Sequence, residues 1–352
     1  MMPTGLADAR RIVVFRGLML GDVLCAVPAW RALRAACPQA TITWVGLPWA
    51  HDLAHRLAKA GVIDDFIPFP GAPGIPEQPP DAAAWPAFLA TVRARRFDWA
   101  LQMHGSGLVS NPVVAQFGAA QMACFVPRRR ARFPADVLVP WPRTGHEIER
   151  LLTLTDALDC PRQGRHLTFP IDDGDRHALQ ALWPADAPPL ASGQAVVVHV
   201  GAQLPSRRWS PQRFAQVADR LAADGHAVVL TGSAGEAPLV AEVAQAMSHP
   251  AIDLAGRTSL WTLGALIERA RLVVCNDTGL SHIAAALHTP SVVVSCGAEV
   301  PRWAPLDQAL HPVLWHDLPC RPCAHVHCPL DHDCARAITA EAVWHEVQMR
   351  LA

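Results

Sequence analysis

Short apolar runs alternate with helical patterns of hydrophobic residues along the first half of the chain. Strands are predicted at residues 12–15, 41–45, 66–69, 99–103 and 123–126, and helices at residues 22–36, 50–58, 83–95 and 146–158. This alternation predicts a parallel sheet that is covered by helices on both faces. Pro28 lies within the first predicted helix, so we expect a kink there.

The alternation restarts after a proline-rich stretch at residues 184–194. Strands are predicted at residues 195–200, 228–230, 272–275 and 291–295. Ser210, Ser259 and Thr339 each mark the start of a helical pattern, where a hydroxyl side chain can cap the first turn. We therefore expect two Rossmann-like domains, at residues 1–183 and 184–352, with the last helix, 339–352, packed back on the first domain.

Composition agrees with two compact domains and narrows the function. Of the 352 residues, 51% are hydrophobic and 17% are charged, which is typical of globular proteins. The net charge of −1 argues against a nucleic-acid partner, because general nucleic-acid binders carry a basic surplus. Residues 1–11 lack the apolar core of a signal peptide, and no apolar run is long enough to span a bilayer. We expect a cytoplasmic protein that is still able to touch a membrane surface.

The first strand-to-helix junction carries a candidate catalytic carboxylate. Gly17 and Gly21 bracket the turn after strand 12–15, and Asp22 stands where the predicted helix begins. Asp22 is then either an N-cap that satisfies free N–H groups or a general base at the carboxyl edge of the sheet. The residues alone leave both alternatives open.

A matching junction follows strand 272–275 in the second half. Asp277, Thr278 and Gly279 form a turn that leads into a helix of small residues, and His282 lies one turn further on. Free N–H groups at the start of a helix, a hydroxyl and an imidazole suit a phosphate, although the same residues also form an ordinary helix-starting turn. Two such junctions, one in each half, suggest a ligand held between two α/β domains.

Three further side chains follow strands of the second half. Arg207 and Arg208 lie in the loop after strand 195–200, where two guanidinium groups could hold a phosphate. Glu236 follows strand 228–230 and is either a ligand of ribose hydroxyls or a carboxylate favoured in the first turn of a helix.

Two further clusters of side chains stand out in the sequence, one of arginines and one of cysteines. Arg128, Arg129 and Arg130 form a basic run that either meets a phosphorylated or lipid-anchored acceptor or is simply solvated. The second cluster has metal-ligand density, with interleaved histidines, and comprises Cys320, Cys323, Cys328 and Cys334. Because its spacing fits no standard zinc finger, we favour a structural or redox-labile thiol cluster and expect no metal.

Some familiar nucleotide-binding motifs are missing from the sequence. Neither half has Gly-x-Gly-x-x-Gly after its first strand, and no Gly-Lys-Ser/Thr loop occurs. The usual dehydrogenase and P-loop fingerprints are therefore excluded.

The ordered set of motifs resembles glycosyltransferase family 9, the ADP-heptose:lipopolysaccharide heptosyltransferases. The resemblance is carried by residues 16–24 (RGLMLGDVL), 28–33 (PAWRAL), 201–211 (GAQLPSRRWSP), 253–260 (DLAGRTSL) and 276–287 (NDTGLSHIAAAL). It extends from about residue 11 to the last helix. One departure is Arg207, where the family often has lysine, and Lys59 is the only lysine of the chain.

The resemblance implies a GT-B fold, with two parallel sheets facing a central cleft, and inverting sugar transfer. Asp22 would be the general base, and donor binding would fall to Arg207, Arg208, Glu236, Thr258, Asp277, Thr278, Gly279 and His282. The implied donor is ADP-heptose or another nucleotide sugar, and the implied acceptor is a lipopolysaccharide core or related glycan. No cofactor is required if arginines and a helix N-terminus stabilise the departing diphosphate.

Two other functions remain compatible with the residues. A nucleotide-sugar epimerase or hydrolase would share the two-domain architecture but need no acceptor. A non-catalytic nucleotide-binding protein would explain the arginine in place of the family's lysine.

Overall fold

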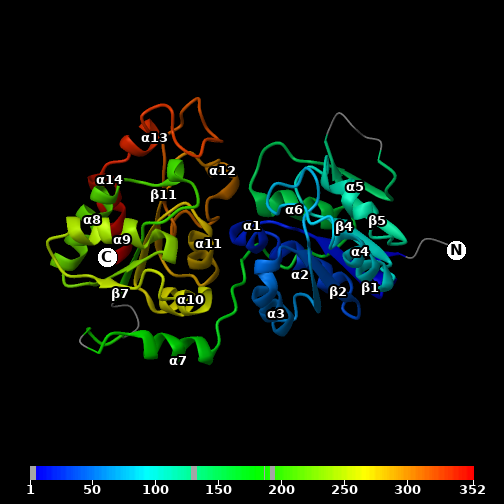
Figure 1. Ribbon diagram of the computed structural model, residues 1–352, viewed down its shortest axis with the longest axis horizontal. Helices are drawn as coiled ribbons and strands as arrows, with labels where there is room; N and C mark the ends of the chain where they lie inside the picture. Colours follow the sequence, from blue (N-terminus) through cyan, green and yellow to red (C-terminus); the bar gives the residue numbers. More distant parts are fainter. Residues whose placement is uncertain (1–4, 128–132, 186, 191–194) are drawn as a thin grey trace. The chain divides into compact units, whose positions relative to one another are not determined.

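A computed structural model describes residues 5–127, 133–185, 187–190 and 195–352. The chain divides into two compact units, Met1–Pro170 and Ile171–Ala352. Each unit is an α/β fold built on a six-stranded sheet with helices on both faces (Figure 1).

The first unit has the strand order β3-β2-β1-β4-β5-β6, and every neighbouring pair is parallel. The strands are β1 (Arg11–Phe15), β2 (Thr41–Gly46), β3 (Asp65–Pro68), β4 (Trp99–Gln102), β5 (Gln121–Val126) and β6 (Val137–Pro140). The helices are α1 (Leu20–Leu24), α2 (Val27–Ala36), α3 (His51–Lys59), α4 (Trp85–Ala94), α5 (Ser110–Ala115) and α6 (Glu147–Asp156). The five strands predicted for this half are confirmed, and the edge strand β6 is additional.

The helix predicted at residues 22–36 is broken rather than kinked. Two helices stand in its place, α1 and α2, and Pro28 lies in the first turn of α2. Proline has no N–H to donate but is tolerated where the amide would have no intrahelical partner, so a new helix begins beside it. The break leaves α1 as a short helix directly after β1.

The second unit repeats this topology with the order β12-β11-β10-β7-β8-β9, again entirely parallel. Its strands are β7 (Ala195–His199), β8 (Ala227–Thr231), β9 (Ile252–Asp253), β10 (Leu272–Asn276), β11 (Ser291–Val294) and β12 (Val313–Leu314). Its helices are α7 (Asp173–Leu182), α8 (Pro211–Ala223), α9 (Ala237–Ala246), α10 (Leu260–Arg269), α11 (Gly279–Ala286), α12 (Val300–Trp303), α13 (Asp333–Arg336) and α14 (Ala340–Leu351).

The predicted helix starts of this unit are confirmed in position. Ser259 Oγ accepts a hydrogen bond from Thr262 N at the start of α10, and Thr339 Oγ1 accepts one from Ala342 N at the start of α14. Ser210 is the N-cap of α8 but makes no side-chain cap hydrogen bond.

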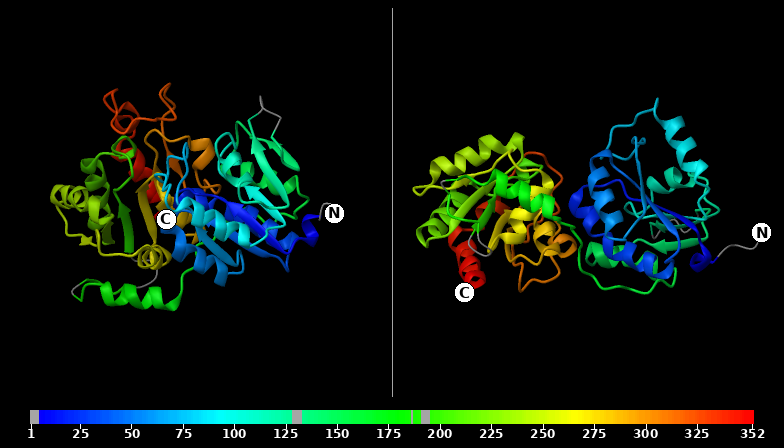
Figure 2. Two further views of the ribbon diagram at one scale, coloured as in Figure 1. Left: turned by 45° about the vertical axis from the view of Figure 1, so that its right-hand side comes forward. Right: turned by 90° about the horizontal axis from the view of Figure 1, so that it is seen from below.

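Two helices of the second unit lie at its ends in the sequence. Helix α7 precedes the proline-rich stretch, and it packs against α10. Its N-terminus is a capping box, in which Asp172 and Asp175 each accept a hydrogen bond from the other's backbone N–H. We expected the last helix to return to the first domain; its buried residues Val343 and Val347 lie in the core of the second unit. Helix α14, the red helix that ends at the C-terminus in Figure 2, packs against α8, β10 and β11.

Both sheets have a topological switch point. Strand β1 lies between β2 and β4, and β7 lies between β8 and β10. In each sheet the chain adds two strands on one side of the central strand and then crosses to its other side. Ligands of open α/β sheets bind outside the carboxyl ends of the strands at such points. The loops that follow β1, β4, β7 and β10 are therefore the first places to look for a site. Within the residues that the structure describes, no helix is long and apolar enough to cross a bilayer.

Candidate active site

The first candidate half-site is the loop and short helix after β1. The strand ends at Phe15, and Asp22 is the third residue of α1. The N-cap position belongs to Met19, which makes no side-chain cap hydrogen bond. The alternative in which Asp22 is the N-cap is therefore wrong, because Asp22 lies three residues after the N-cap. A carboxylate in the first turn is still favoured by the helix dipole.

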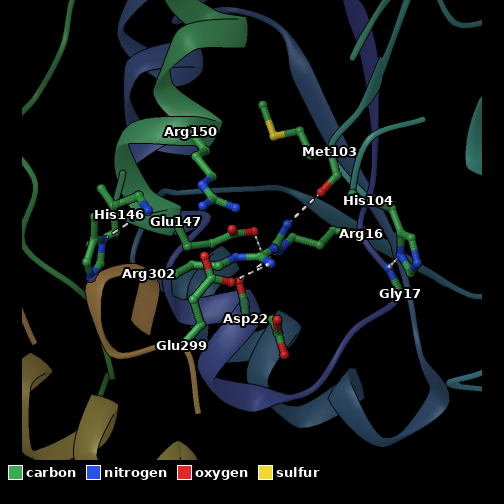
Figure 3. A network of polar contacts seen from close by, with 12 residues as sticks. Arg16, Gly17, Asp22, Met103, His104, His146, Glu147, Arg150, Glu299 and Arg302 are labelled. Atoms are coloured by element: carbon green, nitrogen blue, oxygen red, sulfur yellow. Dashed lines mark hydrogen bonds and ion pairs between the residues drawn. The ribbon is translucent and has the colours of Figure 1, made fainter. Parts of the chain in front are cut away.

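Arg16 organises this half-site from inside the unit (Figure 3). Its side chain is fully buried, with Nε donating to the backbone oxygen of Asp22 (2.8 Å) and Nη1 to that of Met103 (2.6 Å). Nη2 forms an ion pair with Glu147 Oε1 at 3.2 Å, and that carboxylate is also buried. The guanidinium therefore ties the first turn of α1 to the end of β4 and to α6. The backbone that carries the Asp22 carboxylate is held in place by this network.

His104, after β4, holds the glycine turn of the same half-site. Its Nδ1 accepts a hydrogen bond from Gly17 N at 3.3 Å, and its ring stacks on Phe15 with centroids 5.3 Å apart. Burial, and secondarily the nearby Arg16 guanidinium, lower the pKa of His104 to about 4. The imidazole is thus neutral at pH 7. This agrees with the hydrogen bond from Gly17 N, because Nδ1 can accept it only when it carries no proton.

This burial predicts a pH-dependent stability. The pKa of His104 is about 4 in the folded protein and about 6.5 when unfolded, so the unfolded chain binds more protons between these values. The contribution of neutral His104 to the free energy of unfolding is complete above pH 6.5 and is lost as the pH falls towards 4. The loss is about 2 kcal/mol at pH 5. Urea unfolding at pH 7 and pH 5 should show a smaller pH dependence for His104→Gln than for the wild type. The exposed His51 provides the control: His51→Gln should keep the wild-type pH dependence, and an equal flattening in both variants would contradict the assignment.

The second candidate half-site begins where β10 meets α11. The strand ends at Asn276, and Thr278 is the N-cap of α11, with Oγ1 accepting from Leu280 N at 3.3 Å. Gly279 is the first residue of the helix. The turn-and-cap interpretation of this motif is therefore confirmed. The N–H groups of the first helical turn still suit an anion.

Asp277 lies among two cations and a hydroxyl. Its Oδ2 accepts a hydrogen bond from Ser295 Oγ at 3.0 Å, at the end of β11. Burial raises the pKa of Asp277, and the Ser295 hydroxyl, Arg207 and Arg321 oppose that rise. Two guanidinium groups beside one carboxylate leave this corner of the sheet with a surplus of positive charge.

Asn276 fastens the loop that carries the two arginines. Its buried amide donates from Nδ2 to Val200 O at 2.8 Å, and its Oδ1 accepts from Trp209 N at 2.9 Å. Within this loop, Arg208 Nε donates to Ala202 O at 3.0 Å. The start and end of the 201–209 loop are thus both bonded to the last residue of β10. Arg207 and Asp277 are brought to one corner by this side chain.

Glu236 lies on the backbone of Gly201. A Cβ added at Gly201 would stand 2.2 Å from Glu236 Oε1, so a larger residue there would displace this carboxylate. Glu236 Oε2 accepts from both the backbone N–H and the hydroxyl of Ser233, at 2.8 Å each, as half of a capping box. Burial acts to raise the pKa of Glu236, but the Ser233 hydrogen bonds, His199 and Arg208 hold it below the usual value. The carboxylate is therefore ionised, fixed in position, and able to accept further hydrogen bonds.

The remaining predicted donor residues occupy neighbouring elements. Thr258 is half-buried and directly precedes the N-cap of α10. His282 is buried in the first turns of α11, at 5% exposure. Gly256 N donates to Gly232 O at 2.9 Å, which joins the loops after β8 and β9. These loops lie at the carboxyl edge of the second sheet, as the sequence predicted.

The sequence also predicted two clusters of side chains. Arg128, Arg129 and Arg130 lie outside the described residues. The four clustered cysteines, Cys320, Cys323, Cys328 and Cys334, are free thiols, of which Cys334 is buried and the others are half-buried. Over the described ranges, no group of three or more histidine, cysteine or acidic side chains is arranged to hold a metal ion.

Several residues of these half-sites gave no signal of their role in the sequence. Glu147 is 131 positions from Arg16, and Asn276 is 67 positions from Trp209. Arg321 belongs to the cysteine-rich segment, which the sequence analysis treated only as a thiol cluster. Arg16 gave the one hint of such a contact. An arginine directly after an apolar strand is expected to be buried, and a buried charge needs a partner.

Comparison with known proteins gives a consistent family. The family model described as "Glycosyltransferase family 9 (heptosyltransferase)" matches residues 85–333. Lipopolysaccharide heptosyltransferase 2 of Escherichia coli (strain K12) is 26% identical over 310 residues, which cover 81% of this chain and 82% of that protein.

Solved structures show the same architecture. The structure of E. coli ADP-heptose lps heptosyltransferase II superposes with a TM-score of 0.74 at 21% identity, covering 97% of this chain and 98% of that one. E. coli heptosyltransferase WaaC with ADP-2-deoxy-2-fluoro heptose superposes with a TM-score of 0.67 at 20% identity, covering 96% and 99%. The expected GT-B class, with two Rossmann-like units on parallel sheets, is thereby confirmed.

Proposed function

The chain belongs to glycosyltransferase family 9, and from this premise we propose that it transfers heptose from ADP-heptose to a lipopolysaccharide core or related glycan. The reaction is a single displacement with inversion at the anomeric carbon. The observation that carries the proposal is the position of the family's two aspartate junctions. Asp22 follows β1 and Asp277 follows β10, and both strands border a topological switch point.

Asp22 acts as the general base of this reaction. Its carboxylate takes the proton of an acceptor hydroxyl while the hydroxyl oxygen bonds to the anomeric carbon of the donor. Arg16 holds the backbone that carries this base. Its Nε bonds the backbone oxygen of Asp22, and its charge is balanced by Glu147. The base is therefore carried by a turn that is anchored at several points.

The second unit binds the donor. Glu236 accepts hydrogen bonds from the ribose hydroxyls, and Thr258 lies beside the nucleoside. The diphosphate binds at the first turn of α11, with Thr278, Gly279 and His282. Fixed N–H donors and cations at such a place stabilise the charge that develops on the leaving group.

The leaving group is ADP. As the new glycosidic bond forms, the bond between the anomeric carbon and the β-phosphate oxygen breaks, and its electron pair stays on ADP. Arg207 and Arg208 balance the resulting charge, so that the chemistry needs no divalent ion. A guanidinium offers two parallel donors to a phosphate where the family's lysine offers a point charge.

The acceptor chemistry also bears on location. A lipopolysaccharide core is lipid-anchored, so the enzyme works in the cytoplasm at the face of the inner membrane. Arg128, Arg129 and Arg130 would meet anionic groups there. The epimerase or hydrolase and the non-catalytic binder are not favoured, because the relatives named above are heptosyltransferases.

A donor screen tests the proposal. Purified protein is incubated with a lipid A–core acceptor and, separately, ADP-heptose, UDP-sugars or GDP-sugars, and products are read by mass spectrometry. The acceptor should gain one heptose with ADP-heptose and no sugar with the others. The Asp22→Asn variant serves as the matched inactive control. Transfer of a different sugar, or no transfer from ADP-heptose to any core acceptor, would contradict the proposal.

A further inference from the structure

The cysteine-rich segment, residues 320–334, is bonded to the loop that carries Arg207. Ser206 N donates to Val326 O at 3.0 Å, and Ser206 Oγ donates to His325 O at 2.5 Å. Arg207 Nη2 donates to Cys323 O at 2.8 Å. The segment therefore determines where the Arg207 guanidinium lies.

Arg321 belongs to this segment and reaches the same corner of the second sheet. Its Nη1 donates to Ala298 O at 2.8 Å, and its Nη2 donates to Ser295 O, in the loop after β11. Ser295 is also the residue whose hydroxyl bonds Asp277. The Arg207 side chain lies at the same loop, because a Cβ added at Gly297 would stand 3.8 Å from Arg207 Nε and Arg321 bonds the carbonyl of the next residue, Ala298.

Both guanidinium groups keep donors in reserve. Each has five N–H groups, of which Arg321 uses two and Arg207 one in the hydrogen bonds described above. The Nε atoms of both side chains are buried without any hydrogen-bond partner. A buried donor without a partner is costly, and two of them at the same loop point to a ligand with several acceptor oxygens.

Gly297 lets the cysteine-rich segment pack closely against the loop after β11. Gly297 has a φ of +83°, and a Cβ there would stand 2.8 Å from the Cβ of Cys323 and 3.7 Å from the Cδ of Arg207. Asp277 alone cannot neutralise two guanidinium groups. The corner therefore has a net positive charge at the N-terminus of α11, which favours an anion with more than one negative charge.

We propose that Arg321 is a second guanidinium ligand of the donor's diphosphate, acting as a pair with Arg207. This inference rests on the proposed function, since it adds a residue to the donor site of the second unit. It also assigns a role to the cysteine-rich segment. The segment supplies Arg321 itself and, through the Cys323 carbonyl, orients Arg207.

Calorimetric binding of ADP and of adenosine to the full-length protein tests this assignment. Arg321→Gln should weaken ADP binding by about 10- to 100-fold, because hydrogen bonds to a charged group are lost. Adenosine affinity should not change, because adenosine has no phosphate. Arg321→Lys keeps the charge with fewer donors and should give a smaller loss of ADP affinity.

Arg213→Gln is the matched control for a structural effect. Arg213 Nη1 bonds the carbonyls of Ala335, Arg336 and Ile338, so it anchors the segment before α14 to α8 through backbone oxygens. This variant should bind ADP as the wild type does. If Arg321→Gln does not fold, Arg321→Lys decides the question, since the proposal requires weaker ADP binding from it with adenosine unchanged.

The outcomes separate this inference from the proposed function. Wild-type ADP affinity in an Arg321 variant, or an equal loss for ADP and adenosine, would overturn the diphosphate role of Arg321 and leave the proposed function intact. A wild-type protein that binds ADP but transfers nothing from ADP-heptose would instead overturn the proposed function.

Discussion

Replacing Asp22 by asparagine should lower kcat by about 100- to 10,000-fold, the usual contribution of a general base. Asparagine has nearly the same shape, so α1 and its bond to Arg16 should persist. The proposed donor site lies in the second unit, and the affinity for ADP should therefore remain within about twofold of the wild-type value. Initial rates with saturating ADP-heptose and acceptor, together with ADP calorimetry, give both quantities.

The matched control is Asp98→Asn, because Asp98 directly precedes β4 and its carboxylate bonds the start of β1, the strand that Asp22 follows. Asp98 Oδ2 accepts from the backbone N–H groups of Arg10 and Arg11, at 2.7 and 2.8 Å, where β1 begins. An asparagine oxygen can still accept these bonds, and kcat should be unchanged. Wild-type turnover in Asp22→Asn, or an equal loss in Asp98→Asn, would show that Asp22 is not the base.

The largest loss of stability should come from breaking the buried ion pair of the first unit. Glu147→Gln leaves the Arg16 charge buried at 0% exposure without its carboxylate partner. Removing one member of a buried pair typically costs about 3 to 5 kcal/mol, because the remaining charge is not solvated. Urea unfolding followed by tryptophan fluorescence should show this as a lower midpoint. Turnover should also fall, since Arg16 positions the turn that carries Asp22.

An exposed pair provides the comparison. Arg220 Nη2 and Glu341 Oε1 are 2.8 Å apart, and the two side chains are 41% and 72% exposed. Exposed pairs contribute little, so Glu341→Gln should leave the urea midpoint almost unchanged. In the double variant Arg16→Met/Glu147→Leu, the loss should be smaller than the sum of the single losses, because no unpaired charge remains. Equal midpoints for Glu147→Gln and Glu341→Gln would contradict the structural role of the pair.

Local sequence signals account for most of the fold. Alternating apolar strands and helical patterns predicted both sheets, since each strand in a parallel sheet is a short apolar run between helices. Two features were less visible. The capping box Asp172–Asp175 identifies α7 only once its reciprocal hydrogen bonds are known. Pro28 predicted an irregularity in residues 22–36 but not whether the helix would bend or end.

The candidate site divides in the same way. Asp22 and Asp277 could be predicted from the sequence because each lies within a few residues of a strand end. There, position in the sequence predicts position on the sheet. The partners that hold them come from distant segments. No periodicity or motif relates Arg16 to Glu147, or Asp277 to Arg321, because such pairs are made by the order of strands in the sheet and not by neighbouring residues.

The most direct test of heptose transfer is to measure ADP release from ADP-heptose by the purified protein with and without a lipid A–core acceptor. If the protein is a transferase whose base acts on an acceptor hydroxyl, ADP should form in step with heptosylated acceptor and remain near background when the acceptor is left out. ADP release at the same rate without acceptor would show that water or an internal rearrangement consumes the donor, and would contradict the account.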